Sequence, residues 1–143
     1  MWRVFIAVIG MAIAACAQIS PSPEQTRAAQ KMEAVPGKSV VYIVQDSFPD
    51  HNAGLILDDG TQIRTWPGTF YRWVTIPGAR TIRSSAGSLS ASINLQVEAG
   101  KIYFVRHSLR GIRGGATSAR LHKVDDRTGR RLVTTGTLCC AAN

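Results

Sequence analysis

The chain has 143 residues, which leaves room for one domain of about 100 residues once an N-terminal signal and a linker are set aside. Lysine and arginine outnumber aspartate and glutamate by 17 to 9, and the excess is concentrated after residue 100. A basic surface of this kind favours anionic partners, among which nucleic acid is a poor candidate outside the cytoplasm. A solvated face that keeps the protein soluble explains the same charge equally well.

Residues 1–15 have the layout of a bacterial lipoprotein signal peptide. Arg3 supplies a positive start, an apolar run too short to span a bilayer follows, and residues 13–16 (IAAC) have the form of a lipobox. We therefore expect cleavage before Cys16 and acylation of that cysteine, for example with palmitate, which tethers the protein to a membrane. Ala17 is not acidic, which by the bacterial sorting pattern favours the outer membrane, facing the periplasm. An ordinary secretory signal with an incidental Cys16 is the alternative.

Residues 16–37 form a small, polar linker that contains three prolines. Ser22 and Gln25 stand at the positions of a capping box and Pro23 stands in the first turn, so a short helix is predicted over residues 23–34. Because this segment has no strong apolar face, we expect a marginal helix that serves as a tether between membrane and domain.

Short β-like runs separated by turn residues fill residues 38–126, and they predict an all-β fold, an antiparallel β-sandwich of about seven or eight strands. Residues 39–45 have the composition of a buried strand, whereas residues 89–97 alternate, which predicts one buried and one wet face. Residues 127–143 are interpreted as a basic segment of weak helical character and a tail with two cysteines. The predicted strands are residues 39–45, 54–57, 61–65, 69–76, 79–84, 89–97, 101–108 and 118–124.

Four segments, in this order, resemble a known family. They are residues 37–42 (GKSVVY) after the lipobox, 74–80 (VTIPGAR), 98–105 (EAGKIYFV) and 121–124 (LHKV). The chain is thereby similar to the bacterial lipoproteins grouped as domain of unknown function 2846, over about residues 37–133. The resemblance implies a prealbumin-like sandwich in the bacterial envelope and supplies no catalytic residues. Arg80 departs from the family pattern, in which a histidine or similar residue often follows Pro-Gly-x.

The histidines do not form a catalytic or metal-binding pattern. His51 lies in an acidic loop, which is more typical of a solvated loop than of a weak cation site. A polar loop predicted over residues 109–117 sets His107 opposite about Thr117, well away from His122. No phosphate-binding loop or nucleophile elbow accompanies them. We therefore expect neither an enzyme nor a cofactor or metal.

Two groups of side chains are candidates for binding. Arg110 and Arg113 lie in the glycine-rich polar loop and could hold a phosphate or carboxylate, although a flexible hairpin tip is the simpler interpretation. Trp66, Tyr71 and Trp73 could form a platform on which a sugar stacks, although sandwich cores also need aromatic side chains.

Cys139 and Cys140 are adjacent near the end of the chain. A disulfide between neighbouring residues is strained and uncommon. The pair could cross-link two copies, capture a partner, or remain buried and inert. No CxxC spacing occurs, so a thioredoxin-like motif or a zinc knuckle is not indicated.

These observations together predict a membrane-anchored envelope lipoprotein that acts as a non-enzymatic structural or interaction module. Its partners would be the membrane, through lipid on Cys16, and an anionic envelope component or envelope protein met by the basic C-terminal half. A carbohydrate- or peptidoglycan-binding module that uses the aromatic residues is the alternative function.

Overall fold

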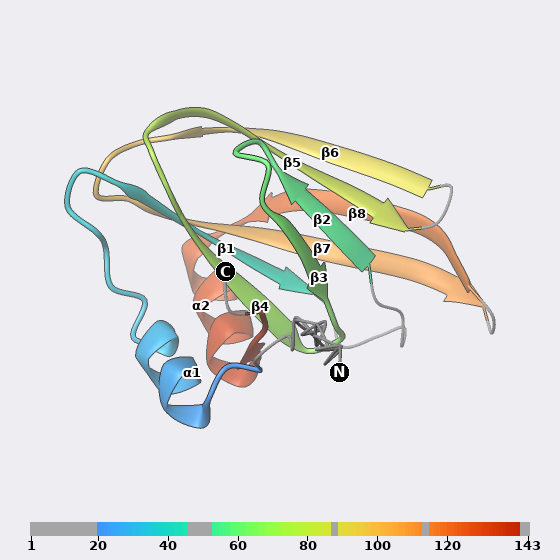
Figure 1. Cartoon of the computed structure of the whole chain (residues 1–143), viewed down its shortest axis with the longest axis horizontal. Helices are drawn as coiled ribbons and strands as arrows, with labels where there is room; N and C mark the ends of the chain where they lie inside the picture. Colours follow the sequence, from blue (N-terminus) through green and yellow to red (C-terminus); the bar gives the residue numbers. More distant parts are fainter. Residues whose placement is uncertain (1–19, 46–52, 87–88, 113–114, 141–143) are drawn as a thin grey trace, which may run out of the picture.

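The computed structural model describes residues 20–45, 53–86, 89–112 and 115–140. These residues form two sheets that pack face to face, so the predicted all-β sandwich is confirmed (Figure 1). The strands are β1 (Ser39–Gln45), β2 (Ala53–Leu57), β3 (Gln62–Thr65), β4 (Thr69–Thr75), β5 (Gly78–Ala86), β6 (Leu89–Val97), β7 (Ile102–Ile112), β8 (Gly115–Val124) and β9 (Thr137–Leu138); the helices are α1 (Pro23–Gln30) and α2 (Asp126–Thr135).

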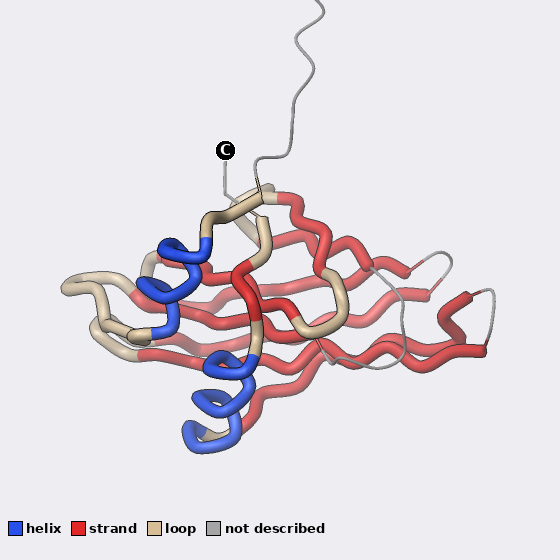
Figure 2. The backbone as a smooth tube through the Cα atoms, turned by 90° about the horizontal axis from the view of Figure 1, so that it is seen from below, coloured by secondary structure: helices blue, strands red, loops and turns tan. Residues whose placement is uncertain are grey.

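The larger sheet has the strand order β8-β7-β1-β4-β9 and the smaller sheet the order β3-β2-β5-β6. Both helices lie on the outer face of the larger sheet, which gives three layers (Figure 2). The smaller sheet is antiparallel throughout, as predicted. The larger sheet is mixed, because β1 pairs with β7 and β4 pairs with β9 in parallel. The expectation of a purely antiparallel sandwich is wrong for this sheet.

Strand β1 lies at the centre of the larger sheet, between β4 and β7, and every one of its residues is buried. Successive side chains of a strand point to opposite faces. Val41 and Ile43 therefore enter the core between the sheets, whereas Val40 and Tyr42 enter a second core under the helices. This double burial explains why the segment contains no apolar–polar alternation.

Helix α1 begins as predicted, with Ser22 and Gln25 completing the capping box. It is packed against the sheet and does not serve as a free tether. The hydroxyl of Tyr42 donates to the carbonyl oxygen of Ala29 at 2.7 Å, and the side chain of Gln30 donates to the carbonyl oxygen of Gly136 at 2.9 Å. Its small buried residues, Thr26 and Ala29, let the helix approach the sheet without a wide apolar stripe.

Helix α2 and strand β9 follow the last long strand and pack against the larger sheet. Asp125 caps the helix by accepting the backbone N–H of Thr128 at 2.9 Å. Gly129 then lies directly on Phe104, since a Cβ at that position would be only 2.1 Å from Cγ of the ring. The helix has few apolar residues, and its close approach through Gly129 and buried Val133 is what holds it on the sheet.

The β7–β8 hairpin has a different register from the predicted one. The two strands run on to Ile112 and from Gly115, where a polar loop over residues 109–117 was expected. His107 consequently pairs with Leu121 instead of Thr117. Opposite Arg110 and Gly111, a bulge in β8 accommodates one extra residue, Thr117. The pattern of apolar residues does not predict a bulge of this kind.

Candidate functional site

Basic side chains gather on the outer face of the larger sheet, which also carries α1 and α2 and is called the helix-bearing face below. On β8, Val124 belongs to the core under the helices, so Arg120 and His122 share its face because side chains two residues apart point the same way. Both are exposed. The strand pairing sets Arg106 and Ser108 of β7 beside them.

Helix α2 adds three exposed arginines to the helix-bearing face, Arg127, Arg130 and Arg131. Asp126 pairs with Arg130 at 2.7 Å, one turn along the helix. Asp125 is occupied as the helix cap, and its hydrogen bonds with Thr128 lower the pKa of the Asp125 carboxyl. Neither acid forms an ion pair with the guanidinium of Arg127 or Arg131, and no other acidic side chain in the described part of the chain pairs with these two guanidiniums.

Of the two predicted anion-binding residues, Arg110 and Arg113, the structure describes only Arg110. Arg110 is exposed near the end of β7. It lies two residues after Ser108 and four after Arg106, so it shares the helix-bearing face with both of them. Arg113 lies outside the described residues, as do Cys16 and His51. The grip of Arg110 and Arg113 on one anion therefore stays a prediction.

The three predicted sugar-stacking residues do not form a platform. Trp66 is 49 % exposed in the turn before β4, but Tyr71 and Trp73 are buried in the core between the sheets, Trp73 with only 3 % of its surface exposed. Core packing, the alternative interpretation, holds for both, and Trp73 takes no part in sugar stacking. Of the three predicted sugar-stacking residues, only Trp66 presents an exposed ring.

The buried indole of Trp73 is tied to the surface by a carboxylate. Its Nε1 donates to Oδ2 of Asp59 at 2.9 Å, in the turn between β2 and β3. Partial burial opposes ionisation of Asp59, but the hydrogen bonds from Thr61 and Trp73 outweigh it and hold the pKa of Asp59 below its usual value. The hairpin turn is thereby attached to β4.

A buried polar cluster between the two sheets was missed by the sequence analysis. Nε2 of His107 lies 2.6 Å from Oγ of Ser84, and Nδ1 lies 3.4 Å from Oγ1 of Thr65, which donates to Oε1 of Gln45 at 2.5 Å. The alternation of residues 105–109 could have revealed it, because His107 shares a face with Val105 and Leu109.

The Ser84–His107 contact has the length of a nucleophile–base pair in hydrolases. Ser84, however, is only 1 % exposed, so its hydroxyl is closed to a substrate in this conformation. The cluster satisfies the hydrogen-bonding groups of polar side chains in the core, as buried polar groups require.

His107 and His122 cannot share a metal ion. Strand pairing joins His107 to Leu121 and Arg106 to His122, which sets the two imidazoles on opposite faces of the sheet. Within the described ranges, no three His, Cys, Asp or Glu side chains come together as a set of metal ligands.

Cys139 and Cys140 are present as thiols whose sulfur atoms lie 2.8 Å apart. Cys139 is buried in the core between the sheets, whereas Cys140 is half exposed at its margin. The structure thus brings the pair together but gives its two members different access to solvent.

Neither described helix is long and apolar enough to cross a membrane. No family model matches the chain, and no curated protein matches it. The resemblance to domain of unknown function 2846 therefore remains a prediction.

Proposed function

We propose that the protein is a non-enzymatic lipoprotein of the bacterial envelope, anchored through Cys16, whose sandwich presents the helix-bearing face to an anionic envelope surface. The observation that carries this proposal is that the basic side chains and the N-terminal helix share one face of the larger sheet. A surface of phosphate-bearing lipid headgroups is the partner that such a face fits.

The length of the tether supports this orientation. Four residue steps separate Cys16 from Ser20, the first described residue, and even a fully extended chain spans only about 14 Å over that length. Helix α1 begins three residues later and packs on the helix-bearing face. Lipid on Cys16 would therefore keep that face near the membrane and leave the smaller sheet turned toward the periplasm.

The range of the electrostatic attraction makes this proximity important. A Lys or Arg close to an anionic membrane contributes about 1 kcal/mol, and the attraction falls off within roughly 8 Å at physiological salt. Arg127 and Arg131 would lie within that distance only if the helix-bearing face is the one that meets the membrane. Sugar binding, the alternative function, has weaker support because Trp66 is the one predicted stacking residue with an exposed ring.

Two measurements test the proposal. The first is the intact mass of the protein extracted from bacterial membranes, beside Cys16→Ser. A mass that fits cleavage before Cys16 plus acyl chains, and that is lost in the variant, supports the anchor. A mass without lipid contradicts it.

The second measurement tests the contact face with the unacylated chain from residue 17 onward. Binding to vesicles of phosphatidylcholine with phosphatidylglycerol is compared for Arg127→Gln/Arg131→Gln and for Arg64→Gln/Arg83→Gln. Both double variants remove two positive charges, but Arg64 and Arg83 lie on the outer face of the smaller sheet. We expect the first pair to weaken binding by roughly tenfold or more and the second to have a smaller effect. Equal losses would contradict the proposed face.

A further inference from the structure

The end of the described chain holds two thiols that the proposed function does not use. The backbone N–H of Cys139 donates to the carbonyl oxygen of Phe70 at 2.8 Å, and that of Thr137 donates to the carbonyl oxygen of Gly68 at 3.1 Å. These bonds fix the segment along β4. Cys139 is only 4 % exposed and cannot move far, because its side chain belongs to the core between the sheets.

The backbone then turns sharply at Cys140. Its φ of 53° lies in the left-handed region, which residues other than glycine adopt rarely. In a regular strand the two side chains would point to opposite faces. This turn instead brings the sulfur of Cys140 to 2.8 Å from that of Cys139, and to 3.1 Å from the carbonyl oxygen of Arg64. An unusual backbone conformation at a reactive side chain is a feature of functional sites.

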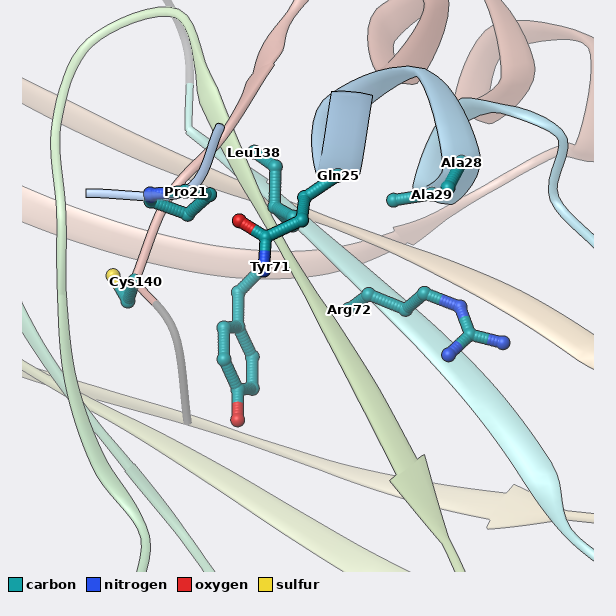
Figure 3. Close-up of a pocket in the computed structure, with 8 residues that line it drawn as sticks. All are labelled: Pro21, Gln25, Ala28, Ala29, Tyr71, Arg72, Leu138 and Cys140. Carbon is teal, nitrogen blue, oxygen red and sulfur yellow. The ribbon is translucent and has the colours of Figure 1, made fainter. Parts of the chain in front are cut away.

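Cys140 also opens onto a cavity of about 420 Å³ between α1 and the β4–β9 edge. Figure 3 shows Cys140 and Pro21 on one side of this cavity and Arg72 on the other, with Tyr71 and Gln25 between them. A small thiol compound or an extended peptide segment has room there.

We propose that Cys139 and Cys140 form a reversible thiol–disulfide pair, in which Cys140 attacks an external disulfide and Cys139 resolves the product. In the first step Cys140 loses its proton to water and its sulfur bonds to one sulfur of the external disulfide, whose other sulfur leaves as a thiolate. In the second step Cys139 loses its proton to water, and its thiolate attacks the sulfur of Cys140. The bond between the two cysteines forms, and the remaining half of the reagent leaves as a second thiolate. The pair is oxidised by two electrons and the reagent is reduced to two thiols.

The acid–base properties of the two thiols agree with this order. The hydrogen bond with Cys140 and burial raise the pKa of Cys139, whereas the same hydrogen bond lowers the pKa of Cys140. The thiolate is the attacking species, so the more exposed Cys140 is the first to react. Once the sulfur of Cys140 is bonded to the reagent, it is no longer a thiolate that shares the proton of Cys139, which removes the larger of the two causes that raise the pKa of Cys139.

The adjacency of the two residues makes the product reversible. Neighbouring Cα atoms are about 3.8 Å apart, whereas ordinary disulfides join Cα atoms at roughly 4.4–6.8 Å. A disulfide between neighbours is therefore strained, and strained disulfides are the readily reduced ones. A soft-metal site is less well supported, because the described residues offer no third His, Cys, Asp or Glu ligand beside the pair.

The test uses the chain from residue 17 onward, which retains these two cysteines alone, and oxidised glutathione as the disulfide. After quenching with acid, intact mass and peptide mapping identify the products. We expect the unaltered chain to lose two hydrogen atoms and to retain little glutathione. Cys139→Ser should accumulate one glutathione on Cys140, and Cys140→Ser should react at least about tenfold more slowly. Equal rates for the two variants, or a stable adduct on the unaltered chain, would overturn the proposal.

A second measurement requires no substitution and therefore does not depend on how well the variants fold. A short pulse of iodoacetamide on the reduced, unaltered chain should label Cys140 well before Cys139, and the difference should disappear in urea. Labelling of Cys139 first, or of both at one rate in the folded protein, contradicts the assigned order of attack.

Discussion

Replacement of Gly129 by alanine tests how α2 is held on the sheet. At an exposed helical position this change would stabilise the protein by about 1 kcal/mol, because alanine is the better helix former. Here the added Cβ would be 2.1 Å from Cγ, 2.4 Å from Cβ and 2.5 Å from Cδ2 of Phe104, whereas carbon atoms in contact are normally about 3.5–4.0 Å apart. The helix must therefore move outward by more than about 1 Å.

Phe104 has no room to turn away, because its ring stacks on Tyr42 at a centroid distance of 5.6 Å and is buried. Overpacking of a core costs about 1–3 kcal/mol, and a contact this short belongs at the upper end. After the gain in helix propensity, we expect Gly129→Ala to lower the free energy of unfolding by about 2 kcal/mol.

The assay is urea unfolding followed by circular dichroism, with Thr134→Ala as the control in the same helix. Thr134 is exposed, so its replacement should change the free energy of unfolding by less than about 0.5 kcal/mol. If Gly129→Ala is as stable as the unaltered chain, the close packing of α2 on Phe104 is refuted.

Three further predictions concern the joins between the layers. Tyr42→Phe removes the hydrogen bond to Ala29 and should cost about 1–2 kcal/mol in urea unfolding, and an unchanged midpoint would argue against a docked α1. Ser84→Ala leaves His107 without its 2.6 Å contact and should cost roughly 1–3 kcal/mol by the same measurement, whereas a gain in stability would mean that the cluster is dispensable. The folded-state pKa of Asp59 lies below its unfolded value, so its ionisation stabilises the protein above about pH 4 and this contribution is lost as the pH falls through the folded pKa. The stability advantage of the unaltered chain over Asp59→Asn should therefore shrink on acidification below pH 4, and a constant difference would contradict this reasoning.

The sequence was sufficient to predict the strands whose burial follows a simple pattern. The segment 39–45 is apolar on both faces because it is the central strand under both cores. The segment 89–97 alternates because β6 is an edge strand with one face in solvent. In both cases the environment of each side chain is fixed by its position along one strand, which periodicity can report.

The features that the sequence did not reveal depend on contacts between distant segments. The parallel pairing of β1 with β7 leaves no local signal, since each strand alone has the composition of any buried strand. Helix α2 has a mostly polar sequence because Gly129 and Val133 supply its contact. The meeting of the Cys139 and Cys140 sulfurs depends on one backbone angle, and adjacency in the sequence predicts the opposite arrangement.

The position of β1 between β4 and β7 also determines the order in which the domain can fold. Val40 pairs with Val74 in the antiparallel register of β1 and β4. Its partner in the parallel register of β1 and β7 is Ile102, which lies about sixty residues after Val40 in the chain. Closure of so long a loop is entropically costly, and topologies dominated by such pairings fold slowly. The central strand of the larger sheet thus lacks its second neighbour until more than two thirds of the polypeptide has emerged. We expect shorter, N-terminal fragments to be unable to form the larger sheet and to depend on other proteins to prevent aggregation.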